Sequence, residues 1–166
     1  FEDFSYCKNA DDFLAKVGFY TTWIGGFCVK NGAIETLENP YRFKYLKLQQ
    51  VDILLNLINK GNKVVVSKEN IFNTATTSIQ GSSYNVAKVF GRNFLKILKV
   101  YLQDKSISSK TYKIVKKDLL IHQINPRYFN FGNKIRFVKS GYFRYLKDYR
   151  YDLYFYFEYC KLPLKF

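Results

Sequence analysis

An apolar repeat with helical spacing constrains the fold more than any other feature of the sequence. In RNFLKILKVYLQD, residues 92–104, large apolar side chains recur at steps of three and four, which places them on one face of a helix. These side chains are Phe94, Ile97, Leu98, Tyr101 and Leu102. Lys96 and Lys99 fall away from that face, and Gly91 stands at its start. The pattern predicts an amphipathic helix that packs its apolar face against a core.

Shorter segments predict strands. VDILLNL, residues 51–57, is a short apolar run typical of a strand buried on both faces. The β-branched threonines of NTATTSI, residues 73–79, predict a second strand, and NVAKVF, residues 85–90, predicts a weaker third. Between the first two, the valines at 64–66 favour a strand by propensity. A crossover helix over about residues 62–70 is the alternative, because parallel neighbours need such a connection.

The first residues add one strand and one helix. FSYC, residues 4–7, is strand-like, and NADDFLAKV, residues 9–17, is helix-like with Asn9 as its cap. Asp11 and Asp12 suit the positive end of that helix. Strands and helices therefore alternate, and the sequence predicts an α/β domain with a mainly parallel sheet flanked by helices.

The charge is large and uneven. The net charge is +14, from 27 Lys+Arg against 13 Asp+Glu, which favours a polyanionic partner, nucleic acid first and an anionic membrane surface second. Residues 106–166 hold 13 Lys+Arg, 4 Asp+Glu and half of the aromatic residues. We therefore predict a core over residues 1–105 and a basic, aromatic C-terminal extension over 106–166. The polar DKSISSK, residues 104–110, would join them, and KTYKIVKK, residues 110–117, is strand-like.

Motifs of common catalytic sites are absent from the sequence, which has no GxSxG, HExxH, P-loop or GxGxxG. The three cysteines are widely spaced and none is near the single histidine, His122, so a zinc site is not expected. His122 lies among apolar residues, where a structural or RNA-stacking role is favoured over that of a general base. No apolar run approaches the roughly 18 residues of a transmembrane helix. We expect no enzymatic activity, no small-molecule substrate, no metal and no cofactor.

Basic and aromatic residues interleave in the extension, in PRYFNFGNKIRF (126–137) and GYFRYLKDYRY (141–151). Basic side chains neutralise phosphates, and aromatic rings stack on unpaired bases. Arginine does both, because its planar guanidinium pairs with phosphate and also stacks. The candidate RNA-binding arginines are Arg127, Arg136, Arg144 and Arg150. Alternatively, the aromatics pack a small second core or a protein partner. NKGNK, residues 59–63, is either a phosphate-binding turn or a solvated one.

The segment FYTTWIGGFCVKN, residues 19–31, contains the only tryptophan, followed by paired glycines. It resembles the tyrosine–tryptophan–glycine–glycine segment of the S-two family of small-subunit ribosomal proteins. The matching residues are Tyr20, Trp23, Ile24, Gly25, Gly26 and, one place out, Asn31. The resemblance extends over about residues 1–104, through Asp52 before ILLN and through Gly91 in VFGRN. The extension has no counterpart in the family.

The resemblance implies a Rossmann-like domain that binds ribosomal RNA and neighbouring small-subunit proteins. Trp23 would be a wedge in the core, and the glycine pair would allow close approach of backbones. Lys60, Lys63 and Arg92 would neutralise phosphates together with the arginines of the extension. Residues with A/T-rich codons (Phe, Tyr, Lys, Asn and Ile) make up 77 of the 166 residues, which favours an organellar gene. Together with this bias, the resemblance implies a place in the mitochondrial ribosome, within the matrix. The alternative is an accessory interaction subunit of an organellar membrane complex, with its aromatic tail on protein or lipid.

Overall fold

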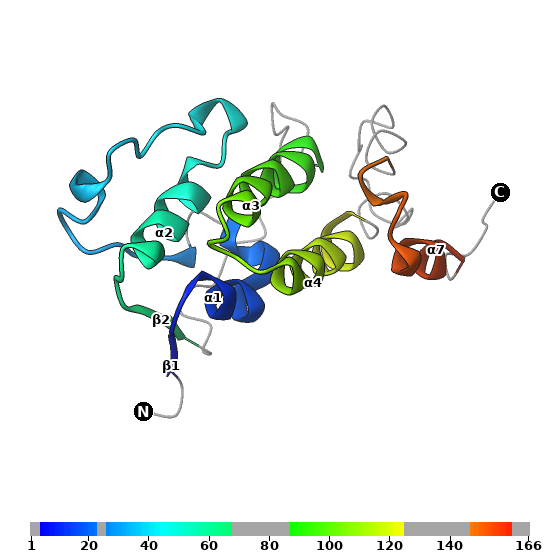
Figure 1. Ribbon diagram of the computed structural model, residues 1–166, viewed down its shortest axis with the longest axis horizontal. Coiled ribbons are helices and arrows are strands. Elements are labelled where there is room, and N and C mark those ends of the chain that lie inside the picture. The colour runs from blue at the N-terminus through cyan, green and yellow to red at the C-terminus, as the bar shows by residue number, and fades with distance from the viewer. Residues whose placement is uncertain (1–3, 23–25, 68–86, 125–146, 161–166) are drawn as a thin grey trace, which may run out of the picture.

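The protein is mainly helical over the residues that its computed structural model describes, which are 4–22, 26–67, 87–124 and 147–160 (Figure 1). The strands are β1 (Phe4–Cys7) and β2 (Val64–Ser67). The α-helices are α1 (Ala10–Val17), α2 (Gln49–Asn59), α3 (Phe94–Gln103), α4 (Ser109–Leu119) and α7 (Leu153–Cys160). The short helices are η1 (Gly18–Thr22), η3 (Ile34–Thr36) and η4 (Lys44–Leu46), and the π-helical segments are η5 (Ala87–Asn93) and η6 (Leu120–Ile124).

The predicted parallel, Rossmann-like sheet is wrong. The described residues contain a single two-stranded sheet, in which β1 and β2 run antiparallel with Phe4 opposite Ser67 and Cys7 opposite Val64. The valines at 64–66 are therefore in a strand, as their propensity predicts. The predicted strand over residues 73–79 lies outside the described part of the chain.

The predicted strand over residues 51–57 is wrong, because these residues lie in helix α2. The sequence suggests a strand there because α2 is buried on nearly every side. Its buried residues are Gln50, Val51, Asp52, Ile53, Leu54, Leu55, Leu57 and Ile58. A helix surrounded by protein carries no polar face, so its sequence shows no helical period and resembles a buried strand. The described residues of the predicted strand 85–90 are also helical, since residues 87–90 belong to η5. Residues 110–117 lie in α4.

Three predicted elements are confirmed. β1 occupies residues 4–7, and α1 follows Asn9, whose side-chain Oδ1 accepts a hydrogen bond from the Asp12 backbone N–H at 2.9 Å. α3 covers the predicted amphipathic segment. Its buried face holds four of the five predicted residues, while Lys96 and Lys99 are exposed.

The main hydrophobic core joins both sides of the predicted 105/106 boundary. Leu98 and Tyr101 of α3 belong to the same buried cluster as Val115 and Leu119 of α4. In Figure 1, α1 and α4 lie side by side below α3, and α4 also packs against η1. The residues on both sides of the boundary therefore share one core.

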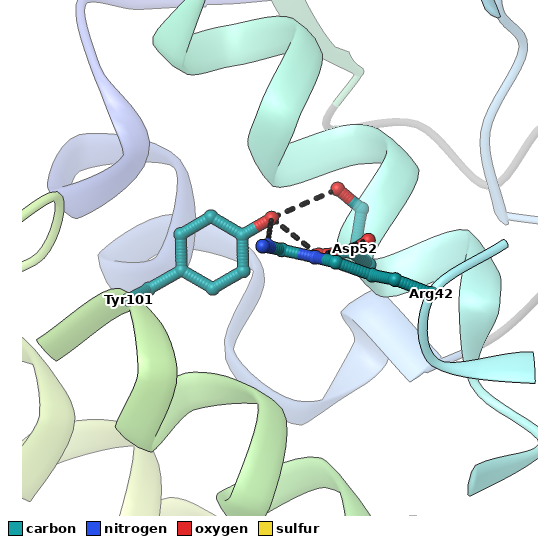
Figure 2. A network of polar contacts seen from close by, with 3 residues as sticks. All are labelled: Arg42, Asp52 and Tyr101. Carbon is teal, nitrogen blue, oxygen red and sulfur yellow. Dashed lines mark hydrogen bonds and ion pairs between the residues drawn. The ribbon is translucent and has the colours of Figure 1, made fainter. Parts of the chain in front are cut away.

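A buried carboxylate organises this core (Figure 2). Asp52 of α2 has no exposed side-chain surface, and the Arg42 guanidinium donates to both of its oxygens, with Nη2 at 2.6 Å from Oδ1 and Nε at 3.0 Å from Oδ2. The Tyr101 hydroxyl lies 2.6 Å from the same Oδ1 and accepts a hydrogen bond from Arg42 Nη2 at 3.0 Å. The segment before α2, α2 itself and the distant helix α3 thus meet at one carboxylate.

The network favours a charged Arg42 beside a neutral Tyr101. The hydrogen bond to Asp52 raises the pKa of Arg42 above its usual value, and burial, followed by the neighbouring Asp52, raises the pKa of the Tyr101 phenol. Paired buried charges are tolerated when further hydrogen bonds satisfy them, whereas removal of one partner leaves the other charge unpaired. Asp52 therefore fixes the positions of Arg42 and α3 relative to α2.

We predict that Asp52→Asn destabilises the fold by about 3 kcal/mol, because it leaves the Arg42 charge beside a neutral amide. This is the lower end of the usual range, since the Arg42 side chain is 33% exposed and stays partly hydrated. The free energy of unfolding would be measured by urea denaturation. Glu38→Gln removes the same charge from an exposed position and serves as the control. Equal stability of the two variants would contradict the role of Asp52.

Candidate nucleic-acid interface

Helix α4 presents an exposed row of lysines. Its N-terminus is capped by Ser108, whose side-chain oxygen accepts the Thr111 backbone N–H at 3.1 Å. Tyr112, Val115 and Leu119 recur at i, i+3 and i+7 and are buried against the core. This spacing fixes which face of the helix points outward.

The outward face carries Lys110, Lys113 and Lys117, all exposed, which we call the lysine stripe. They also recur at i, i+3 and i+7, so they follow one another along the helix over about 10 Å. Among the residues that the structure describes, no carboxylate is in ion-pair contact with any of the three. Lys117 Nζ lies 5.9 Å from the centre of the Tyr154 ring, and the charges of all three lysines are not neutralised by any carboxylate among the described residues.

Lys116 lies beside the stripe but serves a different purpose. Its Nζ is 2.6 Å from Asp152 Oδ2 and 4.9 Å from the centre of the Tyr149 ring. Both side chains of the ion pair are largely buried, at 13% and 18% exposed. Lys116 thus fastens the segment before α7 to α4.

On its other flank, α4 borders a small hollow. The hollow has a volume of about 190 Å³, and its walls include Gly18 and Tyr20 from η1 and Ile114 and Asp118 from α4. Gly18 has a φ of +55°, and a Cβ there would stand 2.6 Å from Asp118 Oδ2. Glycine is favoured there because its φ is positive, and the missing Cβ leaves room for the Asp118 carboxylate.

In the predicted phosphate-binding turn at 59–63, backbone N–H groups form the hydrogen bonds that cap helix α2. The backbone N–H of Gly61 donates to the Ile58 carbonyl at 2.9 Å, and that of Asn62 donates to the Leu57 carbonyl at 3.1 Å. This is a Schellman motif, with Gly61 at a φ of +85°. These N–H groups are therefore engaged in closing α2.

The two predicted lysines of this turn differ. Lys60 Nζ donates to the Thr36 carbonyl at 2.6 Å, although the residue is exposed. Lys63 is also exposed, just before β2. Lys63 is thus the better placed of the two for a phosphate contact.

The predicted arginines have mixed surroundings. Arg92 forms an ion pair with Asp148, with Nε 3.1 Å from Oδ2, and fastens η5 to the residues before α7. Arg150 is exposed, and its guanidinium carbon lies 4.5 Å from the centre of the Tyr151 ring, which is 83% exposed. Arg150 and Tyr151 therefore form an exposed cation–π pair. The other three candidates, Arg127, Arg136 and Arg144, lie outside the described residues.

Residues of the tryptophan–glycine segment are described only in part. The Tyr20 ring is 56% exposed and stacks on Phe19 with ring centres 4.2 Å apart. Gly26 is exposed, and Gly91 is buried within η5. The predicted core wedge Trp23 and its neighbour Gly25 are outside the described ranges.

Among the predicted basic residues within the described ranges, Lys60 and Lys63 do not share a patch with Arg150. In Figure 1, the connection between α2 and β2, which carries Lys60 and Lys63, lies far to the left of the orange segment before α7, which carries Arg150. The lysine stripe between them was missed because residues 110–117 were interpreted as a strand. The helical spacing of Lys110, Lys113 and Lys117 was the available signal.

The described residues contain no group of three or more His, Cys, Asp or Glu placed to hold a metal ion. His122 is 61% exposed, with Nε2 3.6 Å from Asp118 Oδ1 one turn earlier. The buried Asp52 is already bonded to Arg42 and Tyr101. The arrangement with the clearest chemical capacity is therefore the exposed stripe, which can neutralise phosphates.

Comparison of the chain with known protein families, curated proteins and solved structures finds no match.

Buried tyrosines line the junction between α4 and α7. Burial raises the pKa of Tyr112 to about 12, with smaller contributions from Asp148 and Asp152. Burial also raises the pKa values of Tyr149 and Tyr154, whose hydroxyls have no hydrogen-bond partner among the described residues. The folded chain therefore keeps these phenols protonated at a pH where exposed tyrosines ionise.

We predict that the free energy of unfolding falls as the pH rises above 10. Unfolded tyrosine ionises near its usual pKa of 10.0, whereas the folded protein holds these protons to about 12 or beyond. A raised pKa gives stability that is complete below the unfolded pKa and is lost above it. Urea unfolding on either side of pH 10 measures the effect, and a Tyr112→Phe, Tyr154→Phe double variant should lose less stability. Identical pH dependence of variant and parent would contradict the assignment.

Proposed function

We propose that this protein binds RNA without catalysing a reaction, and that it is a constituent of the small subunit of a mitochondrial ribosome. The observation that carries the proposal is the lysine stripe of α4, set in a chain of net charge +14. Its RNA would be ribosomal RNA, and its protein partners would be neighbouring small-subunit proteins. Different observations support the binding of RNA and the membership of a ribosomal subunit.

Support for RNA comes from electrostatics. Each lysine that neutralises a phosphate releases condensed counterions, which favours binding at low salt. Lys110, Lys113 and Lys117 lie along one helix face over a length that spans neighbouring phosphates of one strand. The stacked Arg150 and Tyr151 offer a second exposed contact that combines charge with an aromatic ring.

Support for the ribosome comes from the sequence around Trp23, which resembles the S-two family, and from the A/T-rich codon bias. The parallel sheet that this resemblance implied is not what the structure contains, and Asp52 lies inside a helix instead of before a strand. The proposal that the chain belongs to a ribosomal subunit therefore rests on the local motif, the composition and the charge. The fold does not add to this support.

A second candidate is favoured by the exposed apolar side chains around α7. The exposed fraction is 83% for Tyr151, 77% for Leu153 and 69% for Phe157. Apolar groups gathered at one exposed site are typical of a surface that contacts another molecule. This supports the interaction-subunit alternative. None of the helices in the described ranges has the length and apolar character needed to span a bilayer.

We predict that replacing Lys110, Lys113 and Lys117 with glutamine weakens RNA binding and flattens its salt dependence. For single strands the slope of log affinity against log salt is about −0.7 per phosphate contact, so three lost contacts should reduce its size by about 2. Affinity for a mixed-sequence single-stranded RNA would be titrated at several salt concentrations.

A matched control removes the same charge elsewhere, with Lys8, Lys30 and Lys44 replaced by glutamine. All three are exposed and lie outside α4. The control should keep the parent slope if the stripe is the contact surface. Equal slopes for the parent and the stripe variant, or equal losses in both variants, would contradict the assignment of the stripe.

A further inference from the structure

We infer that the hollow between η1 and α4 holds one unpaired base of the bound RNA, with guanine preferred. This inference rests on the proposed RNA-binding function and adds a specific contact to it. It depends on a carboxylate and an exposed aromatic ring that share one hollow directly beside the lysine stripe. These residues are Asp118 and Tyr20.

Helical geometry places the hollow next to the stripe. Ile114 and Asp118 each follow a stripe lysine by one residue, a rotation of about 100° around the helix axis. That rotation turns them from the outward face toward α1 and η1, where both line the hollow. A strand whose phosphates contact Lys113 and Lys117 therefore passes the mouth of the hollow.

The size and walls of the hollow fit one flat ring system. Its volume of about 190 Å³ is below the range of about 300–1,000 Å³ that is usual for pockets that bind whole small molecules. Tyr20 is 56% exposed and Ile114 is 46% exposed, so both offer accessible apolar surface. Unpaired bases bind proteins by stacking on such aromatic and apolar walls.

The Asp118 carboxylate determines that the base of a nucleotide, and not its phosphate, enters the hollow. Its carboxylate repels a phosphate, and an ionised carboxylate only accepts hydrogen bonds. The nearby ammonium of Lys16 is held elsewhere, donating to the Tyr6 carbonyl at 2.7 Å and to Asp12 at 3.1 Å. The ion-pair partner of Lys16 is thus Asp12. His122 Nε2 lies 3.6 Å from Asp118 Oδ1, and the Asp118 carboxylate lines the hollow as an acceptor.

Guanine is the base that suits such an acceptor. Its pairing edge carries two adjacent N–H donors, which one carboxylate can accept together, as in other bidentate contacts between side chains and bases. Uracil presents a single N–H flanked by two carbonyl oxygens, which a carboxylate repels. The missing Cβ of Gly18 leaves room for the Asp118 carboxylate at the wall of the hollow.

The test compares three RNA hairpins that differ at one position: an unpaired guanine, an unpaired uracil, or no unpaired base. The full chain should bind the guanine hairpin about tenfold more tightly than the fully paired one, since one stacked and hydrogen-bonded base contributes about 1.4 kcal/mol or more. The uracil hairpin should bind with intermediate affinity.

Two variants test which residues contact the unpaired base. Asp118→Asn should reduce the preference for guanine over uracil to less than about twofold, because the amide offers one acceptor and a competing donor. Tyr20→Leu should reduce the preference for either unpaired base over the paired hairpin, because it removes the ring on which a base stacks. Glu38→Gln, at an exposed site far from α4 in sequence, should keep the parent preferences.

The outcomes separate this inference from the proposed function. Equal, salt-dependent affinity for all three hairpins would overturn the base site and leave RNA binding by the stripe intact. An unchanged guanine preference in Asp118→Asn would also overturn it. Failure of the parent to bind any hairpin at low salt would overturn both the inference and the proposed function.

Discussion

The buried carboxylate of Asp52 is the constraint on which the rest of the structure depends. A fully buried charge is tolerated only when it is paired and hydrogen-bonded, and Arg42 and Tyr101 meet that requirement from two other segments. The position of Tyr101 fixes α3, and the short connection after α3 places α4, since Ile107 is buried and its N–H donates to the Tyr101 carbonyl. The exposed lysine stripe is thus positioned by an interaction in the interior.

The distribution of the acidic residues explains why so much positive charge faces solvent. Within the described ranges, four carboxylates are paired with Lys or Arg: Asp12 with Lys16, Asp52 with Arg42, Asp148 with Arg92 and Asp152 with Lys116. The first pair lies within α1, and the other three join segments that are separate along the chain. Because these carboxylates are already paired, they do not neutralise the remaining lysines of α4. The charge of those lysines can therefore attract a polyanion.

The sequence correctly predicts a helix whose apolar and polar faces are distinct. Its predictions are wrong where burial on all sides or β-branched residues obscure the helical repeat of the apolar positions. The helix α3 was predictable because Lys96 and Lys99 separate its faces, whereas α2 is buried nearly all round. The sequence predicts a strand over residues 110–117, which lie in α4. Thr111, Ile114 and Val115 are β-branched and favour strands, but tertiary packing outweighs such propensities. The hollow was beyond sequence reasoning, because it depends on the contact between Gly18 and Asp118, which are distant along the chain.

The most direct test of the central claim, that this chain belongs to a ribosomal particle, is sedimentation of a lysate of mitochondria, in which the chain is followed against ribosomal RNA. The account predicts co-migration with the small-subunit RNA, lost when magnesium is chelated and the particle falls apart. Migration with a membrane complex free of RNA, resistant to high salt and released by detergent, would contradict it. The exposed apolar residues around α7 would then be the surface to follow.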